Sequence, residues 1–310
     1  MTSPPLFTFG TRGSPLALAQ AEEARRRLSE ALGWDLERIA LKVIRTSGDI
    51  IQDRPLAEAG GKGLFTKEID AALLSGEVDA AVHSAKDLPT LLPDGVSLAA
   101  FLPREDVRDA LISVYADAIE ALPRAATFGA ASLRRQAQVL RKRPDLKPEL
   151  LRGNVETRLK KAESGAIGAT LLAMAGLNRL GLAHRARTAL SAETFLPAPG
   201  QGAIAIVARR SDSKTLDALA PVNDSGTAAE LAAERAFLAV LEGSCRTPIA
   251  ALARAGGGGL SFRGQVLRPD GSESFEIEAG GRVEDAEAVG GHAGRDLLAR
   301  LPEGVLQKAE

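Results

Sequence analysis

Short apolar runs alternate with longer amphipathic stretches through the first hundred residues. The runs at 6–10, 38–46 and 78–85 have the length and the flanking residues of buried strands. The stretches at 14–32 and 64–76 space their apolar residues as helices do. This strand–helix–strand–helix–strand order predicts a mainly parallel sheet covered by helices.

A second set of the same kind follows. It consists of the strand 126–130, the helix 132–143, the extended segment 148–153, the helix 154–165 and the strand 168–176. A hinge rich in Pro and Gly then leads, over 196–209, into another strand that is expected to rejoin the first sheet.

The C-terminal part changes pattern and predicts a smaller α+β unit. Its expected elements are a helix at 227–241, strands at 260–267 and 272–280, and a helix at 286–301. We therefore predict an α/β fold with two doubly wound domains and a small third one. The domains are residues 1–102 with 203–220, residues 103–202, and residues 221–310.

Composition indicates an ordinary globular chain, with 45% hydrophobic residues, 25% charged residues and a net charge of −1. We find no signal-peptide pattern and no apolar run near the roughly 18 residues of a membrane span, so we expect a cytoplasmic protein without membrane contact. The single cysteine excludes an internal disulfide framework, and His83, His184 and His292 lie too far apart to suggest a metal site.

The small net charge hides a basic block. Residues 134–161 hold ten Lys and Arg against three Asp and Glu, whereas ten acids face four bases from Asp270 onward. The block suggests an anionic partner, either a nucleic acid or a small molecule with several carboxylates; a solvated helix face is the alternative. The aromatic content of 4% leaves few side chains for stacking nucleic-acid bases.

One local device occurs three times: a strand end, a turn of small residues, an N-capping side chain and a nearby arginine. Helix N-termini favour anions, and arginine recognises carboxylates through two parallel hydrogen bonds. Three copies predict a site for several carboxylates or phosphates. The copies are GTRGSP with Arg12 and Ser14, GAASLRR with Ser132, Arg134 and Arg135, and LRGNVETR with Arg152, Asn154 and Arg158.

The stretch DAAVHSAKDLPT runs from an apolar strand into Ser84, Lys86 and Asp87. Ligands of α/β proteins gather at the carboxyl ends of strands. Asp87 could therefore stabilise a developing cation or transfer a proton, although a surface Lys–Asp pair of little energetic value is the simpler interpretation. A Gly-Gly-Lys-Gly loop with Lys62 would permit close backbone approach or form a mobile lid.

The only cysteine, Cys245, stands in the turn LEGSCRT. A lone cysteine usually packs as a small buried hydrophobe. The adjacent Arg246 and the open turn instead favour a reactive thiol, because a neighbouring cation stabilises the thiolate. The residues alone leave both interpretations open.

Taken together, the motifs resemble the porphobilinogen deaminase family, also called hydroxymethylbilane synthases. They follow one another over nearly the whole chain, and their order is specific. The matching stretches are TRGSPLALAQ, GGKGLFTKEID, DAAVHSAKDLPT, REDVRDALIS, SLRRQ, RPDLKPELLRGNVETRL, MAGLNRLGL, LPAPGQGAI and LEGSCRTPIAA.

The resemblance implies an enzyme that joins four porphobilinogen molecules, with loss of ammonia, into the linear tetrapyrrole hydroxymethylbilane. Family members are monomers whose first two domains are similar to periplasmic ligand-binding folds. They carry a dipyrromethane cofactor on a cysteine thioether, which matches Cys245 here. The family's catalytic aspartate matches Asp87, which would stabilise the azafulvenium-like cation formed as ammonia leaves.

The resemblance also implies roles for the other motif residues, all directed at the acetate and propionate groups of the pyrroles. The cofactor and growing chain would be bound by Ser84, Lys86, Ser132, Arg134, Arg135, Arg152 and Arg158. Substrate would meet Arg12, Ser14 and Gln201, Arg179 would line the elongation path, and Asp49 and Lys62 would belong to a mobile loop.

This chain departs from the family pattern at a few positions. Ala130 and Ala131 stand where Thr-Ser is common, which would remove a hydroxyl contact worth about 1–2 kcal/mol. Ser244 and Glu58 are milder changes, at a common Gly and a common Lys. Two other classes remain as alternatives. A non-catalytic small-anion binder would leave Cys245 and Asp87 without roles, and the low aromatic content and near-neutral net charge argue against a nucleic-acid-binding protein.

Overall fold

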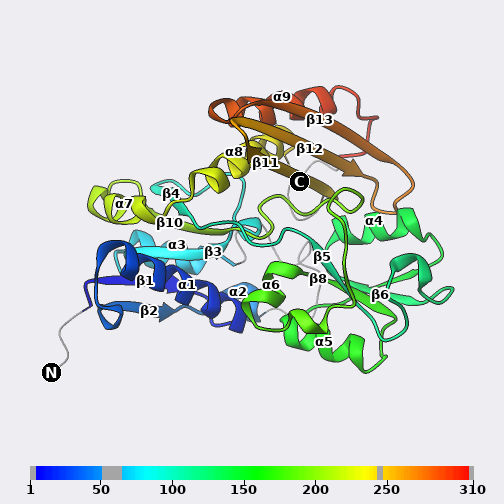
Figure 1. Cartoon of the computed structure of the whole chain (residues 1–310), viewed down its shortest axis with the longest axis horizontal. Coiled ribbons are helices and arrows are strands. Elements are labelled where there is room, and N and C mark those ends of the chain that lie inside the picture. The colour runs from blue at the N-terminus through cyan, green and yellow to red at the C-terminus, as the bar shows by residue number, and fades with distance from the viewer. Residues whose placement is uncertain (1–4, 51–64, 243–246, 307–310) are drawn as a thin grey trace. The chain divides into compact units, whose positions relative to one another are not determined.

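The computed structural model describes residues 5–50, 65–242 and 247–306 (Figure 1). Its contacts divide the chain into two compact units. Unit 1 contains the described residues up to 105 together with 203–228. Unit 2 contains 106–202 and the described residues from 229 onward.

Unit 1 is built on a five-stranded sheet in the order β2-β1-β3-β10-β4. Strand β1 runs parallel to β2 and to the central strand β3, while β10 runs antiparallel to β3 and β4. The strand after the Pro/Gly hinge therefore rejoins the first sheet, as predicted. The strands are β1 (Phe7–Thr11), β2 (Ile39–Val43), β3 (Ala80–Ser84), β4 (Val96–Phe101) and β10 (Ile204–Arg209).

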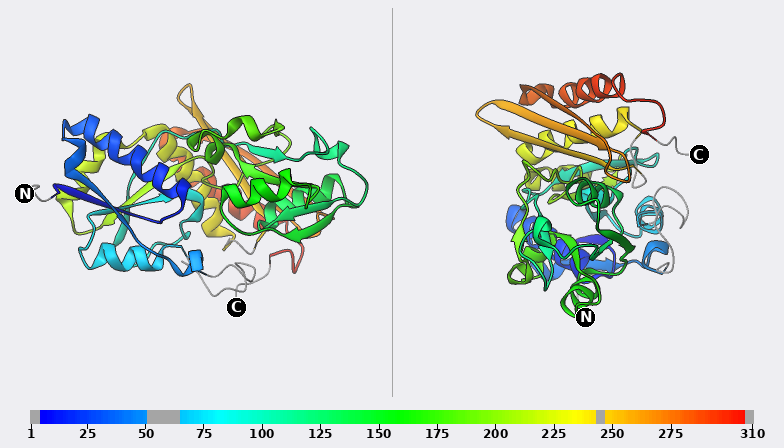
Figure 2. Two further views of the ribbon diagram at one scale, coloured as in Figure 1. Left: turned by 90° about the horizontal axis from the view of Figure 1, so that it is seen from below. Right: turned by 90° about the vertical axis from the view of Figure 1, so that its right-hand side faces the viewer.

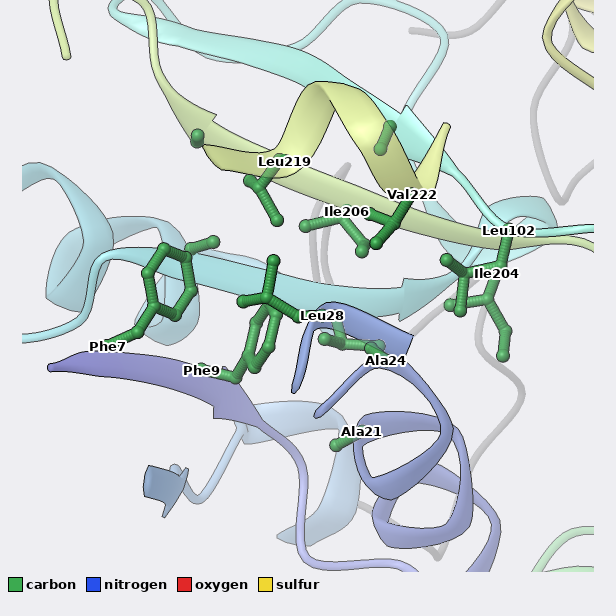
Figure 3. Close-up of a cluster of buried hydrophobic side chains, with 14 of the residues drawn as sticks. Phe7, Phe9, Ala21, Ala24, Leu28, Leu102, Ile204, Ile206, Leu219 and Val222 are labelled. Atoms are coloured by element: carbon green, nitrogen blue, oxygen red, sulfur yellow. The ribbon is translucent and has the colours of Figure 1, made fainter. Parts of the chain in front are cut away.

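The core of unit 1 forms where helices cover this sheet (Figure 3). Helix α1 lays Ala24 and Leu28 against Phe9 of β1, and Leu219 at the end of α7 joins the same cluster. Burial of these apolar side chains is the main force that fixes α1 over the sheet. The helices assigned wholly to this unit are α1 (Pro15–Leu32), α2 (Ser47–Ile50), α3 (Lys67–Leu74) and α7 (Ser213–Leu219).

Unit 2 repeats the arrangement in a second five-stranded sheet, of order β7-β6-β8-β5-β9. Strand β6 runs parallel to β7 and β8, and β5 runs antiparallel to β8 and β9. Each of the two sheets thus combines parallel and antiparallel ladders. The strands are β5 (Asp109–Ile112), β6 (Thr127–Ala130), β7 (Lys147–Leu150), β8 (Ala169–Ala173) and β9 (Thr188–Ala189), and the helices are α4 (Leu133–Lys142), α5 (Val155–Glu163) and α6 (Met174–Arg179).

All three predicted helix caps form. The Ser14 hydroxyl accepts a hydrogen bond from the Ala17 amide at 3.3 Å, at the start of α1. The Ser132 hydroxyl accepts one from the Arg135 amide at 3.4 Å. The Asn154 side-chain oxygen accepts one from the Thr157 amide at 2.9 Å, at the start of α5. Each cap satisfies an amide that the helix itself cannot pair.

The C-terminal part of the chain forms a three-stranded antiparallel sheet with two helices packed on it (Figure 2). Phe237 of α8 and Val289 of α9 meet Phe262 of β12 in one apolar cluster. The elements are α8 (Ser225–Val240), β11 (Ile249–Gly256), β12 (Gly259–Leu267), β13 (Ser274–Arg282) and α9 (Ala286–Leu298).

The predicted fold class is confirmed: helix-covered sheets with parallel strands, followed by a small α+β part. The middle and C-terminal segments share unit 2. The division of the chain into three domains stays a prediction.

A close approach of α9 to α8 gives a prediction about stability. A Cβ atom at Gly290 would lie 1.9 Å from the carbonyl oxygen of Ala233, so one of the two helix backbones would have to move. We expect Gly290→Ala to lower the free energy of unfolding by about 1–3 kcal/mol or more, because overpacking of a core is destabilising by this amount. Urea unfolding measures the change.

The matched control is Gly291→Ala, one residue further along the same helix. A Cβ at Gly291 would meet only the flexible end of Arg295, at 3.5 Å. This substitution should leave stability unchanged or raise it by up to about 1 kcal/mol, because alanine restricts the unfolded chain. Equal effects of the two substitutions would contradict the inferred helix contact.

Candidate active site

In unit 1, the predicted site residues gather at one edge of the sheet. Strands β1 and β3 run parallel, so their carboxyl ends meet at the same edge. Arg12 and Ser14 follow β1, and Ser84 ends β3. Lys86 and the exposed Asp87 lie in the short 3-10 helix Ala85–Asp87 that follows. The sheet thus brings together residues that are about seventy positions apart in the sequence.

Two further residues of unit 1 support this edge, and the sequence patterns did not single them out. The guanidinium of Arg12 lies over the ring of Phe65, 4.1 Å from its centroid, as in a cation–π pair. The buried side chain of Gln20 exchanges hydrogen bonds with the Ser84 hydroxyl, at 2.9 Å and 3.1 Å. Gln20 lies on α1, six residues after the N-cap Ser14. The sequence shows it only as one polar residue of the predicted helix, because its burial is a property of the fold.

The imidazole of His83, the residue before Ser84 on β3, is buried and neutral. Burial, reinforced by the positive charge of Arg12, lowers its pKa to about 4. Its Nε2 has no hydrogen-bond partner among the described residues. His83 therefore adds no positive charge to this edge at neutral pH.

In unit 2, the carboxyl ends of β6, β7 and β8 carry the other predicted residues. Ser132 caps α4, whose first turn holds Arg134 and Arg135. Arg152 follows β7, and Arg158 lies on α5, where its Nε donates to the Gly153 carbonyl at 2.9 Å. Arg179 ends α6, and its Nη2 donates to the Gly202 carbonyl at 3.1 Å.

The structure adds an acidic residue that the sequence patterns did not single out. Asp109 is fully buried and receives hydrogen bonds from Arg134 at 2.8 Å and from Arg135 at 2.6 Å. Gln201, also fully buried, donates through Nε2 to the same carboxylate at 3.0 Å and to the Val107 carbonyl at 2.7 Å. The available signal was an acid placed directly before the apolar run ALI at the start of β5.

The electrostatics of this cluster favour anions. Burial opposes ionisation of Asp109, but its two guanidinium partners outweigh burial and hold the pKa of that carboxyl well below its usual range. Two permanent cations therefore face one anion, which leaves one net positive charge beside the N-terminus of α4. Such a place can take up a carboxylate of a ligand.

Three predicted residues have no described side chain. Asp49 lies in the short helix α2, and Lys62 and Cys245 lie outside the described residues. In the described part of the chain, no helix is long and apolar enough to cross a membrane.

Comparison with known families shows which family carries these groups of residues. The model described as "Porphobilinogen deaminase, dipyromethane cofactor binding domain" matches residues 7–217, and "Porphobilinogen deaminase, C-terminal domain" matches residues 228–299. The chain belongs to the porphobilinogen deaminase family. It is accordingly a transferase of tetrapyrrole biosynthesis that polymerises porphobilinogen and uses a dipyrromethane cofactor.

Individual relatives agree with this assignment. The porphobilinogen deaminase of Nitrobacter winogradskyi is 57% identical over 96% of this chain and 94% of its own length. That of Paracoccus denitrificans is 52% identical over 95% and 94%. A periplasmic substrate-binding protein of an ABC transporter from Coxiella burnetii covers 70% of this chain and 94% of its own, with 14% identity and a TM-score of 0.43, too slight a likeness to bear on function.

Proposed function

We propose that Asp87 is the catalytic group of this porphobilinogen deaminase family member and that Cys245 carries its dipyrromethane cofactor through a thioether. The proposal rests on the excess of cationic side chains at capped helix starts, because each pyrrole unit brings two carboxylates. The family motif around each residue supports the same roles.

The residues of unit 2 fit a group that carries several carboxylates. Arginine is the side chain best suited to planar, bidentate recognition of carboxylate. The buried Nε of Arg134 has no partner among the described residues, and the cluster around Asp109 keeps one positive charge in excess. Ser132, Arg135, Arg152 and Arg158 would hold the cofactor from this unit, together with Arg134. When bound, dipyrromethane supplies the pyrrole end to which substrate units are joined.

The residues of unit 1 would act on the incoming substrate and on the chain that it joins. Arg12 and Ser14, on the substrate side, stand beside the start of α1, where free amides and the helix dipole favour a carboxylate. Ser84 and Lys86, which would bind the cofactor and growing chain, supply a hydroxyl and a cation next to Asp87. An exposed carboxylate at this edge can stabilise the positive charge that develops on the substrate as ammonia leaves, and it can accept a proton from a pyrrole nitrogen.

Other roles complete the proposal. Gln201 and Arg179 would assist binding of substrate and of the growing chain, and Asp49 and Lys62 would belong to the mobile loop. We further propose a monomer that acts in the cytoplasm without nucleic acid. The sequence patterns and the resemblance support these points.

Intact-mass measurement of the denatured, purified protein tests the cofactor. We expect a covalent excess equal to two linked pyrrole units, because denaturation removes any ligand held only by hydrogen bonds and ion pairs. Peptide mapping should place the excess on the peptide that contains Cys245. A protein of unmodified mass that is fully active on porphobilinogen would refute the covalent cofactor.

A further inference from the structure

Asp109 is the buried acid of the arginine cluster of unit 2, which consists of Arg134 and Arg135 around its carboxylate. The proposed chemistry does not use Asp109 directly. It is the first residue of β5, opposite Ala173, the last residue of β8. Because β5 runs antiparallel to β8, the start of β5 lies at the sheet edge where β8 ends. This reversal places a carboxylate among residues that follow parallel strands.

Both oxygens of Asp109 are committed to different partners. Oδ2 accepts from Nη2 of Arg134 at 2.8 Å. Oδ1 accepts from Nη2 and Nε of Arg135, at 2.6 Å and 3.1 Å, and from Nε2 of Gln201 at 3.0 Å. Charge-assisted hydrogen bonds of this kind are about twice as strong as neutral ones, so the carboxylate fixes the planes of both guanidiniums.

The two arginines differ in the hydrogen-bond donors that remain for a ligand. Arg134 is 4% exposed, and its Nη1 donates to the Leu196 carbonyl at 2.7 Å. Both of its terminal nitrogens, Nη1 and Nη2, therefore donate to acceptors of the protein itself. Arg135 uses the Nε–Nη2 edge for Asp109. Its Nη1 lies on the opposite side of the planar group and has no hydrogen-bond partner among the described residues. Arg135 can thus donate to a ligand while Asp109 holds its other edge.

We propose that Asp109 is a positioning residue. It holds Arg135 in the orientation that receives a pyrrole carboxylate, and its negative charge offsets the repulsion between the guanidiniums of Arg134 and Arg135. This inference rests on the proposed function of the arginine cluster. Removal of the Asp109 charge would free the Nε–Nη2 edge of Arg135 and leave two adjacent, buried guanidiniums without a counter-ion.

The test compares purified full-length Asp109→Asn with wild type by intact mass and by steady-state kinetics on porphobilinogen. We expect the fraction of protein that carries the covalent excess to fall several-fold. In the loaded fraction, KM should rise by roughly tenfold, the loss expected for a misdirected charge-assisted hydrogen bond, while kcat changes less. Wild-type loading and wild-type KM in Asp109→Asn would overturn the inference.

A matched control lies at the other end of the same helix. Asp145 accepts from Arg143, the residue after α4, at 2.7 Å and 2.8 Å. Asp145→Asn removes a carboxylate–arginine pair of the same type, partly exposed and at the opposite end of α4 from Arg134 and Arg135. Its loading and KM should equal those of wild type.

A second variant separates orientation from charge balance. Asp109→Asn combined with Arg134→Met returns the cluster to its original net charge, so stability in urea should recover toward wild type. KM should stay above that of Arg134→Met alone, because in the double variant Arg135 still lacks its carboxylate. Equal KM values for Arg134→Met and the double variant, with stability recovered, would show a purely structural role, and so would failure of both Asp109 variants to fold.

The proposed function has its own failure signature in the same experiment. A wild-type protein without the covalent excess would refute the cofactor proposal. A loaded wild type beside an Asp109→Asn variant with unchanged loading and KM would refute only the positioning role.

Discussion

Asp87→Asn is expected to lower kcat on porphobilinogen by roughly 10²–10⁴-fold, the range typical for loss of a positioned acid–base group. Asparagine keeps the shape of the side chain but removes the negative charge that would stabilise the cation formed as ammonia leaves. The covalent mass excess should persist, because Asp87 and the anchoring cysteine have separate tasks. Steady-state kinetics and intact mass measure the two quantities.

Asp94→Asn is the matched control for this substitution. Asp94 is also an exposed aspartate of unit 1, seven residues further along the chain and outside the family motif. Its replacement should change neither kcat nor mass. Neither variant should shift the unfolding midpoint much, since exposed side chains contribute little to stability. Near-normal turnover in Asp87→Asn would remove Asp87 from the chemistry.

Cys245→Ser is expected to abolish both the covalent excess and the activity. A serine hydroxyl is a far weaker nucleophile than a thiolate at neutral pH, so the thioether would not form. Without an attached primer, the arginines of unit 2 would hold no chain end to extend. Intact mass and turnover report the two losses.

The single cysteine makes this test unusually clean. A thiol assay on denatured wild type should find the sulfur blocked, because no other cysteine exists in the chain. Ala substitution at the same position should behave as Ser does. A full mass excess in Cys245→Ser would place the attachment elsewhere.

Helix starts were the most predictable part of the site. Ser14, Ser132 and Asn154 each cap the helix that their motif predicted. A cap joins residues three positions apart, so the local sequence contains all its partners. The arginines beside the caps and the Asp87 motif were found for the same reason.

Some strands escaped prediction because their pairing is not local. The apolar runs of β4 and β5 were not assigned as strands, and α7 was not assigned as a helix. Strand β5 runs against β8, and its partner residues lie about sixty positions away. The few residues of β5 do not indicate whether it pairs in a parallel or an antiparallel direction.

The sequence by itself determined the α/β class, the return of β10 to the first sheet, the caps and the family motifs with Asp87 and Cys245, because these depend on periodicity and short spacing. Only the tertiary structure decided that Asp109 and Gln201 join Arg134 and Arg135, and that Gln20 holds Ser84. These contacts connect residues between 25 and 92 positions apart. Strand order and strand direction, which no local pattern encodes, bring them together.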